Sequence, residues 1–515
     1  MKKRKERKIP LVGIVMMVTA LLLFGCDIDY VRDVMLDRDE LILSLPSGER
    51  AVLTATVLPE FAAEKTVRWS VEPTGIVTLI DNKNSTCTVI PVADGTATVI
   101  ATAVGGRGVS GVCRVKIASA LDNTALVAAV GSQCGWTVET DGTVKLTTEN
   151  LAAIRKVTQL DVSGKSLNDL SGIEWFTGLE SLDCSSNTLT EIDISGNGVL
   201  TELNCADNQM TFLKILAYPA LTSLDVSNNT KMKSLECSRN LKLTALRVAG
   251  CTALTSLDCA GNALTSLDVS GCMALTNLYC YNNGLTSLDV TANTKLTGLN
   301  CHSNALTTLN VSANTALTGL DCRSNALTAL DVSANTALMR LYCGSNRLTS
   351  LDVSANTALT NLSCESNALT SLDVTANTKL TGLDCRSNAL TALDVSANTA
   401  LMRLFCGSNR LTSLDVSANT ELTDLSCESN ALTSLYVSKN TKLSGLWCHS
   451  NRLKLLDVTG ITGLRQLLCG NQTSDGKKVQ ILLLTLTPAQ QTKWKEIWKK
   501  TYREENTYVS LKVIG

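Results

Sequence analysis

The stretch 296-LTGLNCHSNALTTLNVSANTA-316 repeats with small changes along most of the chain and decides its fold. It fits the pattern L-x-x-L-x-C-x-x-N-x-L, followed by T-x-L-D-V-S-x-N-T-x. From Cys259 to Cys469 a cysteine recurs every 21 residues, and Cys184, Cys205 and Cys237 extend the series with one irregular step. A fixed period of this length is typical of a solenoid, in which each coil buries its apolar side chains only against its neighbours.

The repeat also predicts the geometry of one coil. Alternate residues of an extended segment point to opposite sides, so the leucine and cysteine of L-x-C enter the core and the residue between them faces outward. Each coil then adds one strand to a parallel sheet. An asparagine lies three residues past each cysteine, as at Asn304, and a second series, which includes Asn293, follows D-V. We expect both series to bond backbone groups of their own and adjacent coils. Cys251 and Cys272 occupy the second asparagine place.

The first eleven positions of the unit resemble the leucine-rich repeat signature. The full unit, with cysteine in a leucine slot, is similar to the cysteine-ladder repeats of some internalin-like bacterial surface proteins, over about residues 157–470. This resemblance implies a parallel-sheet leucine-rich repeat solenoid. Together with the features of the two ends of the chain considered below, it predicts a mainly β fold in which a β-sandwich is followed by the solenoid with terminal caps. It also implies that the concave sheet face is the ligand surface.

The fourteen ladder cysteines admit several interpretations. Metal sites favour close C-x-x-C pairs, and a catalytic thiol needs a neighbouring base, whereas here the two histidines replace outward-facing residues. Adjacent coils are close enough for a disulfide, but parallel Cβ vectors disfavour its geometry. We therefore expect reduced thiols that act as small hydrophobic side chains, with redox or metal chemistry as the less favoured alternative.

The residues that flank each ladder cysteine vary from coil to coil and form the candidate binding face. Aromatic and charged side chains, the types that anchor interfaces, gather there in a chain with 4% aromatic residues. The predicted ligand-binding residues are Tyr279, Tyr281, His302, Arg323, Tyr342, Glu365, Arg386, Phe405, Glu428, Trp447 and His449. The alternative to a binding face is that these positions are unconstrained and their residues simply drift. The blocks 317–379 and 380–442 differ at only six positions, so their likeness mainly records duplication, although it also suits an extended or repetitive ligand.

The second half of the unit has a more monotonous outward surface. An aspartate recurs there with serine or threonine two places on, as at Asp268 and Asp289. Stacked carboxylates repel one another, which makes a divalent cation conceivable. Without a second acidic position nearby, we expect solvation or hydrogen bonds to turn amides and predict neither a metal site nor a cofactor.

Residues 31–118 show short β-branched segments between turn signals, which indicate an antiparallel sandwich. LTATVLP, Trp69 within VRWSVEP, and DGTATVIATA together resemble the bacterial immunoglobulin-like group 2 domain. Members of that group serve as spacers or adhesive modules, and we expect a spacer here. Cys87 and Cys113 either pair or remain buried free thiols.

The chain starts with a basic segment and a short apolar run that ends in LFGC, which resembles the lipobox of bacterial lipoproteins. Residues 1–25 are thus a predicted signal peptide, Cys26 a lipidation site, and 26–30 anchor and linker; an ordinary signal peptide is the alternative. Lipid chains on Cys26 would attach the protein to a membrane without a spanning helix. Loss of residues 1–25 would leave 40 basic and 46 acidic residues, so no basic field favours nucleic acid.

An open solenoid needs covered ends. Residues 119–156 are the predicted N-terminal cap, in which Cys134 has no evident partner, and 471–515 are a predicted strand-helix-strand C-terminal cap. The helix would bury Trp494, Ile497, Trp498 and Tyr502 over the last coil.

The sequence as a whole predicts a monomeric, non-enzymatic surface protein, lipid-anchored in a bacterial outer membrane, that binds an extracellular protein or glycan. An envelope spacer or matrix lipoprotein without a discrete ligand is the alternative. An enzyme ranks third, because no nucleophile-base pair or phosphate loop is evident and His302 and His449 are seven coils apart.

Overall fold

The computed structural model describes residues 31–59, 65–104, 108–470, 472–474, 477–478, 482–486 and 509–513. They divide into two compact units. The first takes in the described residues up to Leu160 together with Leu170–Leu179 and Asp193–Gly198. The second takes in Asp161–Asp169, Glu180–Ile192 and the described residues from Val199 onward. The division therefore runs through the first coils of the repeat region.

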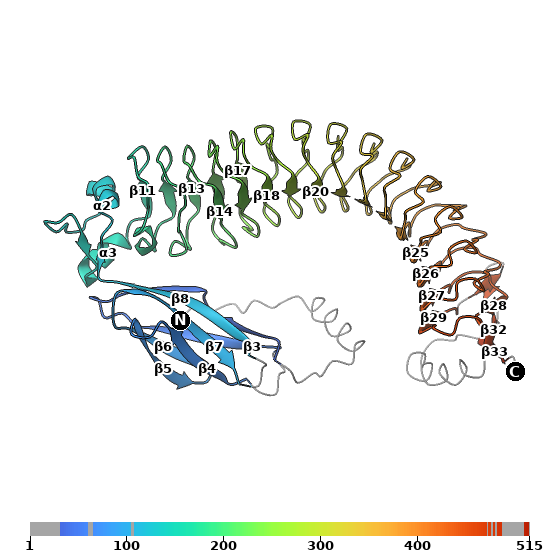
Figure 1. Ribbon diagram of the computed structural model, residues 1–515, viewed down its shortest axis with the longest axis horizontal. Coiled ribbons are helices and arrows are strands. Elements are labelled where there is room, and N and C mark those ends of the chain that lie inside the picture. The colour runs from blue at the N-terminus through green and yellow to red at the C-terminus, as the bar shows by residue number, and fades with distance from the viewer. Residues whose placement is uncertain are drawn as a thin grey trace. The chain divides into compact units, whose positions relative to one another are not determined.

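The first unit opens with two four-stranded sheets (Figure 1). One has the order β1 (Asp33–Leu36), β3 (Ala51–Leu58), β6 (Thr86–Pro91) and β5 (Val77–Lys83), and its neighbours are antiparallel. The other has the order β2 (Glu40–Ser44), β8 (Ser110–Ala118), β7 (Gly95–Ala103) and β4 (Val67–Glu72). Its strands are antiparallel except that β2 runs parallel to β8.

A common core joins these two sheets. Leu53 and Val89 from one sheet and Val99 and Val115 from the other are fully buried in a single cluster. Along β7 and β8 every second residue is buried, and these buried residues are small or apolar, which produces this core. Cys87 and Cys113 are both buried and free, so the pairing that the sequence left open is not formed.

A small mixed segment follows the two sheets. It comprises β9 (Ala120–Leu121), α2 (Thr124–Val130), the 3₁₀ turn η1 (Gly131–Gln133), β10 (Val144–Lys145) and α3 (Thr148–Ile154). Asn123 caps α2 by accepting a hydrogen bond from the Leu126 amide, and Thr147 caps α3 in the same way through Asn150. Cys134 is buried and free. Both helices thus begin at the side chains that elementary capping rules favour.

The repeat coils form two parallel sheets of three-residue strands. The five-stranded sheet contains β11 (Gln159–Asp161), β12 (Ser181–Asp183), β13 (Glu202–Asn204), β15 (Ser223–Asp225) and β17 (Ala245–Arg247), and the 3₁₀ turn η2 (Ile173–Trp175) lies between its first two strands. The thirteen-stranded sheet contains β14 (Phe212–Lys214), β16 (Ser234–Glu236), β18 (Ser256–Asp258), β19 (Asn277–Tyr279), β20 (Gly298–Asn300), β21 (Gly319–Asp321), β22 (Arg340–Tyr342), β23 (Asn361–Ser363), β24 (Gly382–Asp384), β25 (Arg403–Phe405), β26 (Asp424–Ser426), β27 (Gly445–Trp447) and β29 (Gln466–Leu468). Each central leucine pairs with the next, as Leu299 does with Leu320. These features confirm the predicted solenoid of leucine-rich repeat type.

The cysteines form two columns, so the prediction of one ladder with an irregular step is wrong. Cys184 and Cys205 follow β12 and β13 of the five-stranded sheet, whereas the twelve ladder cysteines from Cys237 to Cys469, a set without Cys251 and Cys272, follow strands of the thirteen-stranded sheet. The irregular step marks the point where cysteine moves from one half of the coil to the other. After β15, the next strand of the five-stranded sheet, Val226 occupies the corresponding place. All fourteen thiols are buried and free.

Both predicted asparagine series bond the backbone. Asn304 Nδ2 donates to the carbonyl oxygens of Cys280 and Cys301 at 3.0 Å each, and its Oδ1 accepts from the Leu285 amide at 3.0 Å. In the second series, Asn293 Nδ2 donates to Val269 at 2.9 Å. These bonds hold each coil to the one before it and satisfy buried carbonyl groups.

The C-terminal region adds strands to the other half of the coil. β32 (Leu482–Leu486) and β33 (Val509–Val513) lie where the sequence predicts strands. β32 pairs in parallel with β33 on one side and with β28 (Leu455–Asp457) on the other, while β30 (Thr473–Ser474) pairs with β31 (Lys477–Lys478). The predicted helix, with Trp494, Ile497, Trp498 and Tyr502, lies outside the described residues.

Candidate functional site

The outward residues of β19 to β27, together with the residue after each following cysteine, are called the sheet face below. All eleven predicted ligand-binding residues are partly or fully exposed on it, because Leu and Cys of each L-x-C turn inward and their neighbours turn outward. Tyr279, Tyr342, Phe405 and Trp447 end their strands, and the other seven follow a ladder cysteine. In Figure 1 these strands line the inner side of the curve of coils, as the resemblance implied.

A hollow of about 300 Å³ lies at the C-terminal part of the sheet face. Its lining consists of Arg386, Phe405, Ser426, Glu428, Trp447 and His449. Five of these six residues are among those predicted from the sequence. The rest of the predicted set, from Tyr279 to Glu365, lies on earlier coils of the same face.

The arginines of the sheet face are held in place by two contacts each. Arg386 Nε and Nη2 donate to the Asp384 carboxylate at 3.0 and 2.6 Å, and its guanidinium carbon lies 5.1 Å from the centre of the Phe405 ring. Three coils earlier, Arg323 bonds Asp321 at 3.0 and 2.7 Å and lies 5.2 Å from the Tyr342 ring. The hydrogen-bonded carboxylate raises the pKa of each guanidinium above its usual value. Ion pair and cation–π contact thus fix the orientation of both arginines.

Two glutamates occupy equivalent places in the two blocks. Ser426 Oγ donates to Glu428 Oε2 at 2.5 Å, and Ser363 Oγ donates to Glu365 in the same way. Each carboxylate lies over a glycine of the preceding coil: a Cβ at Gly407 would be 2.2 Å from Glu428 Oε1, and one at Gly344 equally close to Glu365. Glycine at these places therefore lets the carboxylates lie flat on the sheet.

Trp447 owes its position to another glycine. A Cβ at Gly445 would lie 2.5 Å from the indole Cη2 atom and 2.9 Å from Asp424 Oδ1. Gly445, and Ser426 of the hollow lining, are not among the ligand-binding residues predicted from the sequence. The repeat pattern could have identified both, because the two residues that flank the inward leucine of a strand face the same side. The prediction used only the residues that flank each cysteine, so it also omitted Arg340 and Arg403, two exposed cations before the leucine.

An aromatic pair lies nearer the start of the sheet face. The rings of Tyr281 and His302 stack with centroids 4.7 Å apart and an interplanar angle of 18°. His302 Nδ1 lies 2.9 Å from Ser303 Oγ. Partial burial lowers the pKa of His302 below 6.5, an effect that Asp321 opposes and Arg323 reinforces. The environment of this imidazole therefore favours its neutral form.

The buried thiols are poor nucleophiles. Burial raises the pKa of Cys184 and Cys469 to about 12, and that of Cys301 and Cys364 well above the ordinary value. A thiol reacts as its thiolate, so these pKa shifts suppress reaction with oxidants and metals. The geometry supports the structural role expected of the ladder.

The aspartates of the second half-turn bond their own turns. Asp268 Oδ1 accepts from the Ser270 amide at 2.9 Å and from its hydroxyl at 2.7 Å, and Asp289 bonds Thr291 likewise. These hydrogen bonds lower the pKa of both carboxyls. Among the described residues, no group of three or more histidine, cysteine, aspartate or glutamate side chains has the arrangement of a metal site.

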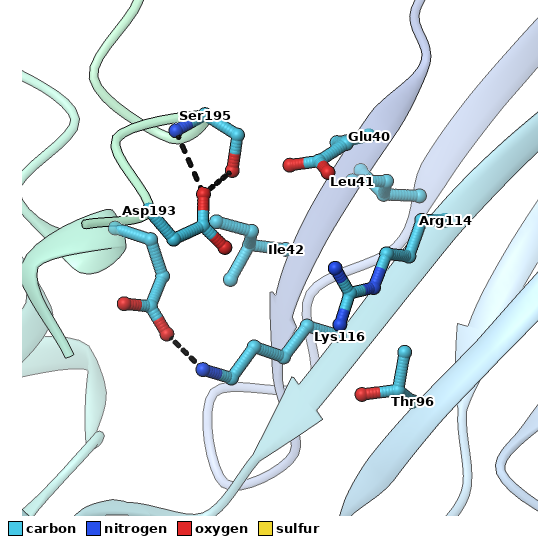
Figure 2. A pocket seen from close by; sticks show the side chains of 9 residues that line it. Glu40, Leu41, Ile42, Thr96, Arg114, Lys116, Asp193 and Ser195 are labelled. Carbon is cyan, nitrogen blue, oxygen red and sulfur yellow. Dashed lines mark hydrogen bonds and ion pairs between the residues drawn. The ribbon is translucent and has the colours of Figure 1, made fainter. Parts of the chain in front are cut away.

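A second, smaller hollow of about 120 Å³ belongs to the first unit. Figure 2 shows the Lys116 ammonium bonded to a carboxylate, which is that of the buried Glu174, and Asp193 bonded to the amide and hydroxyl of Ser195. The Gly172 amide also donates to Glu174 at 2.7 Å. These charged groups are engaged with the chain itself, and the hollow belongs to the packing of the first unit.

No helix within the described parts of the chain combines the length and apolarity required to cross a bilayer.

Comparison with known proteins gives matches among solved structures only. A scan against protein-family models finds no match, and a search of curated proteins finds none. The functional domain of InlJ from Listeria monocytogenes, which includes a cysteine ladder, is 36% identical and matches 71% of this chain and 79% of its own length, with a TM-score of 0.49. A leucine-rich repeat protein of Leptospira interrogans is 22% identical, with a TM-score of 0.45 and coverage of 70% of this chain and 97% of its own. The internalin InlF of Listeria monocytogenes is 19% identical, with a TM-score of 0.40 and coverage of 67% and 95%.

The sequence identity to the InlJ domain agrees with the geometry of the chain itself. Three-residue parallel strands, leucines in register, and a column of buried cysteines recur at the same period. The chain belongs to the internalin-like leucine-rich repeat proteins that carry a cysteine ladder.

Proposed function

We propose that this chain is a non-enzymatic binding protein of the bacterial cell surface, and that its sheet face takes an extracellular protein or glycan. The observation that carries the proposal is the hollow between Arg386 and His449, where two of the few aromatic residues meet a carboxylate and an ion-paired arginine. Concave sites with apolar walls and a few fixed polar groups are the usual form of a binding site.

The remainder of the chain supports display at a surface. In this proposal, Cys26 is acylated after removal of residues 1–25 and holds the monomer on the outer membrane, and both segments lie outside the described residues. The two packed sheets of residues 31–118 act as an immunoglobulin-like spacer, with residues 119–156 and 471–515 as caps of the 157–470 solenoid. Mass spectrometry of the mature N-terminus tests the anchor, which an unmodified Cys26 would refute. Protease treatment of intact cells tests whether the solenoid faces the medium.

The decisive experiment compares aromatic residues on the two halves of the coil. Beads that carry the purified chain are tested for attachment to cultured epithelial cells. Substitution of Tyr342, Phe405 and Trp447 by alanine is expected to abolish attachment, because it removes the apolar walls of the sheet face. Tyr436→Ala is the matched control, since Tyr436 is 77% exposed but belongs to the second half of its coil.

The two candidate functions predict different outcomes. If the triple variant folds normally and attaches like the wild type, the sheet face is not a binding surface, and an envelope spacer or matrix protein becomes the better account. If both variants lose attachment, the loss is not specific to the sheet face. Circular dichroism and urea unfolding establish that each variant retains the native fold.

A further inference from the structure

The hollow contains a carboxylate that has no ion-pair partner among the described residues. Arg386 Nε and Nη2 donate hydrogen bonds to the Asp384 carboxylate, and the Ser426 hydroxyl donates one to Glu428. The Glu428 carboxylate forms no ion pair with the lysines and arginines of the described chain, and its remaining lone pairs can accept further hydrogen bonds. A ligand that supplies a cationic donor would complement this carboxylate.

The charges around the hollow also leave a negative excess. Arg386 and Asp384 neutralise each other. At the start of the strands, Arg403 of β25 is the register partner of Asp424 of β26, so these two charges balance as well. Arg386 also interacts with Glu428, but the sum of these charges stays negative, and Glu428 lies beside an aromatic wall that includes Trp447.

The equivalent place three coils earlier lacks this excess. Arg323, Tyr342 and Glu365 repeat the arrangement, but the register partner of Arg340 is Asn361 rather than an aspartate. The charges around this equivalent place therefore sum to zero, whereas those around the hollow sum to a negative value. The position of Trp447 is taken there by Asp384, which binds Arg386. The chain thus contains a nearly identical site that lacks both the charge and the indole.

We infer that the hollow lined by Phe405, Glu428 and Trp447 binds the cationic side chain, lysine or arginine, of a protein partner. A carboxylate beside an aromatic face favours a cation through a charge-assisted hydrogen bond and a cation–π contact. This inference rests on the proposed binding function and assigns its ligand to proteins rather than glycans.

Isothermal titration calorimetry in low-salt buffer with pentalysine as the probe tests the inference. The full mature chain is expected to bind pentalysine, and pentalysine acetylated on every side-chain amine is expected not to bind. Glu428→Gln keeps the size of the side chain and removes its charge, so affinity should fall about tenfold. Glu421→Gln is the control, because Glu421 is an exposed carboxylate outside the sheet face that pairs with Lys442 at 2.6 Å, and the affinity of this variant should match that of the wild type.

Three results would overturn the inference: no binding of pentalysine, equal binding of the acetylated peptide, or an unchanged affinity in Glu428→Gln. Its failure is separable from failure of the proposed function. If Glu428→Gln beads attach to cells like the wild type while the triple aromatic variant does not, the sheet face binds a ligand that is not a cation. If the triple variant also attaches, the binding function itself is wrong.

Discussion

Asparagine and cysteine exchange at one buried place in the second half of the coil. Asn377 Nδ2 donates to the carbonyl oxygens of Val353 and Asn356 at 2.9 Å, and its Oδ1 has no partner among the described residues. At the equivalent place, the Cys272 thiol donates to Val248 at 3.4 Å. This position therefore requires a side chain that donates a hydrogen bond to the buried carbonyl, and the amide oxygen of asparagine contributes little to stability.

This requirement predicts the outcome of two substitutions at Asn377. Asn377→Ala removes the donor to two buried carbonyls and should lower the free energy of unfolding by about 1–3 kcal/mol. Asn377→Cys retains a hydrogen-bond donor toward the Val353 carbonyl, so it should lower the free energy of unfolding clearly less than Asn377→Ala. Urea unfolding followed by circular dichroism measures both. Equal losses would show that packing, and not the donor, determines the choice at this place.

His302 predicts a pH dependence at the residue scale. Its folded pKa is lowered by burial, so between that value and 6.5 the unfolded chain binds more protons than the folded chain. Its contribution to stability is therefore complete above pH 6.5 and falls as the pH is lowered through this range. An NMR titration of the two histidines, assigned with His302→Gln, should give a pKa below 6.5 for His302. A value at or above 6.5 would contradict the stacked, partly buried ring.

At the scale of the strand, β27 depends on Gly445 to place Trp447. Gly445→Ala should move the indole, because the new Cβ would lie 2.5 Å from it, and should weaken pentalysine binding as much as Trp447→Ala does. Gly319→Ala is the control, since its nearest neighbour, an Arg340 nitrogen, is 3.8 Å away. Calorimetry with both variants checks the prediction. If Gly445→Ala bound like the wild type, the indole could adopt another position without loss.

The repeat elements could be predicted from the sequence because their period is local. Spacing alone placed leucine and cysteine inside and the eleven variable residues outside. The shift of cysteine between the two halves of the coil could not be found in this way, since Cys205 and Cys237 obey the same local pattern. Nor could the hollow, because it depends on where the side chains of Arg386 and Trp447 lie against neighbouring coils. The immunoglobulin-like assignment, the anchor and the binding role stay predictions.

For the whole molecule, the duplicated block predicts a shortened chain that still folds. Deletion of residues 380–442 joins Lys379 to Leu443 and keeps the cysteine spacing at 21 residues. Stacked coils contact only their neighbours, so the solenoid should close without a defect, and the dependence of its unfolding free energy on urea should decrease with the buried surface.

The same deletion should rebuild the hollow. Trp447 and His449 would come to follow the coil of Glu365, beside Tyr342 and Arg323. Pentalysine should bind this variant, although more weakly, because Asn361 replaces Asp424. A folded deletion variant without any affinity for pentalysine would show that the hollow needs more of the chain than its lining.

The buried thiols make the folded molecule resistant to oxidation and the unfolded molecule sensitive to it. While the coils are closed, fourteen unreactive sulfurs are stored out of reach of oxidants. Once the chain opens, all of them become exposed together on one polypeptide, where air or a neighbouring chain can link them at random. Refolding then competes with disulfide cross-linking, so in an oxidising medium the lifetime of the protein is expected to depend on how rarely it opens rather than on its equilibrium stability.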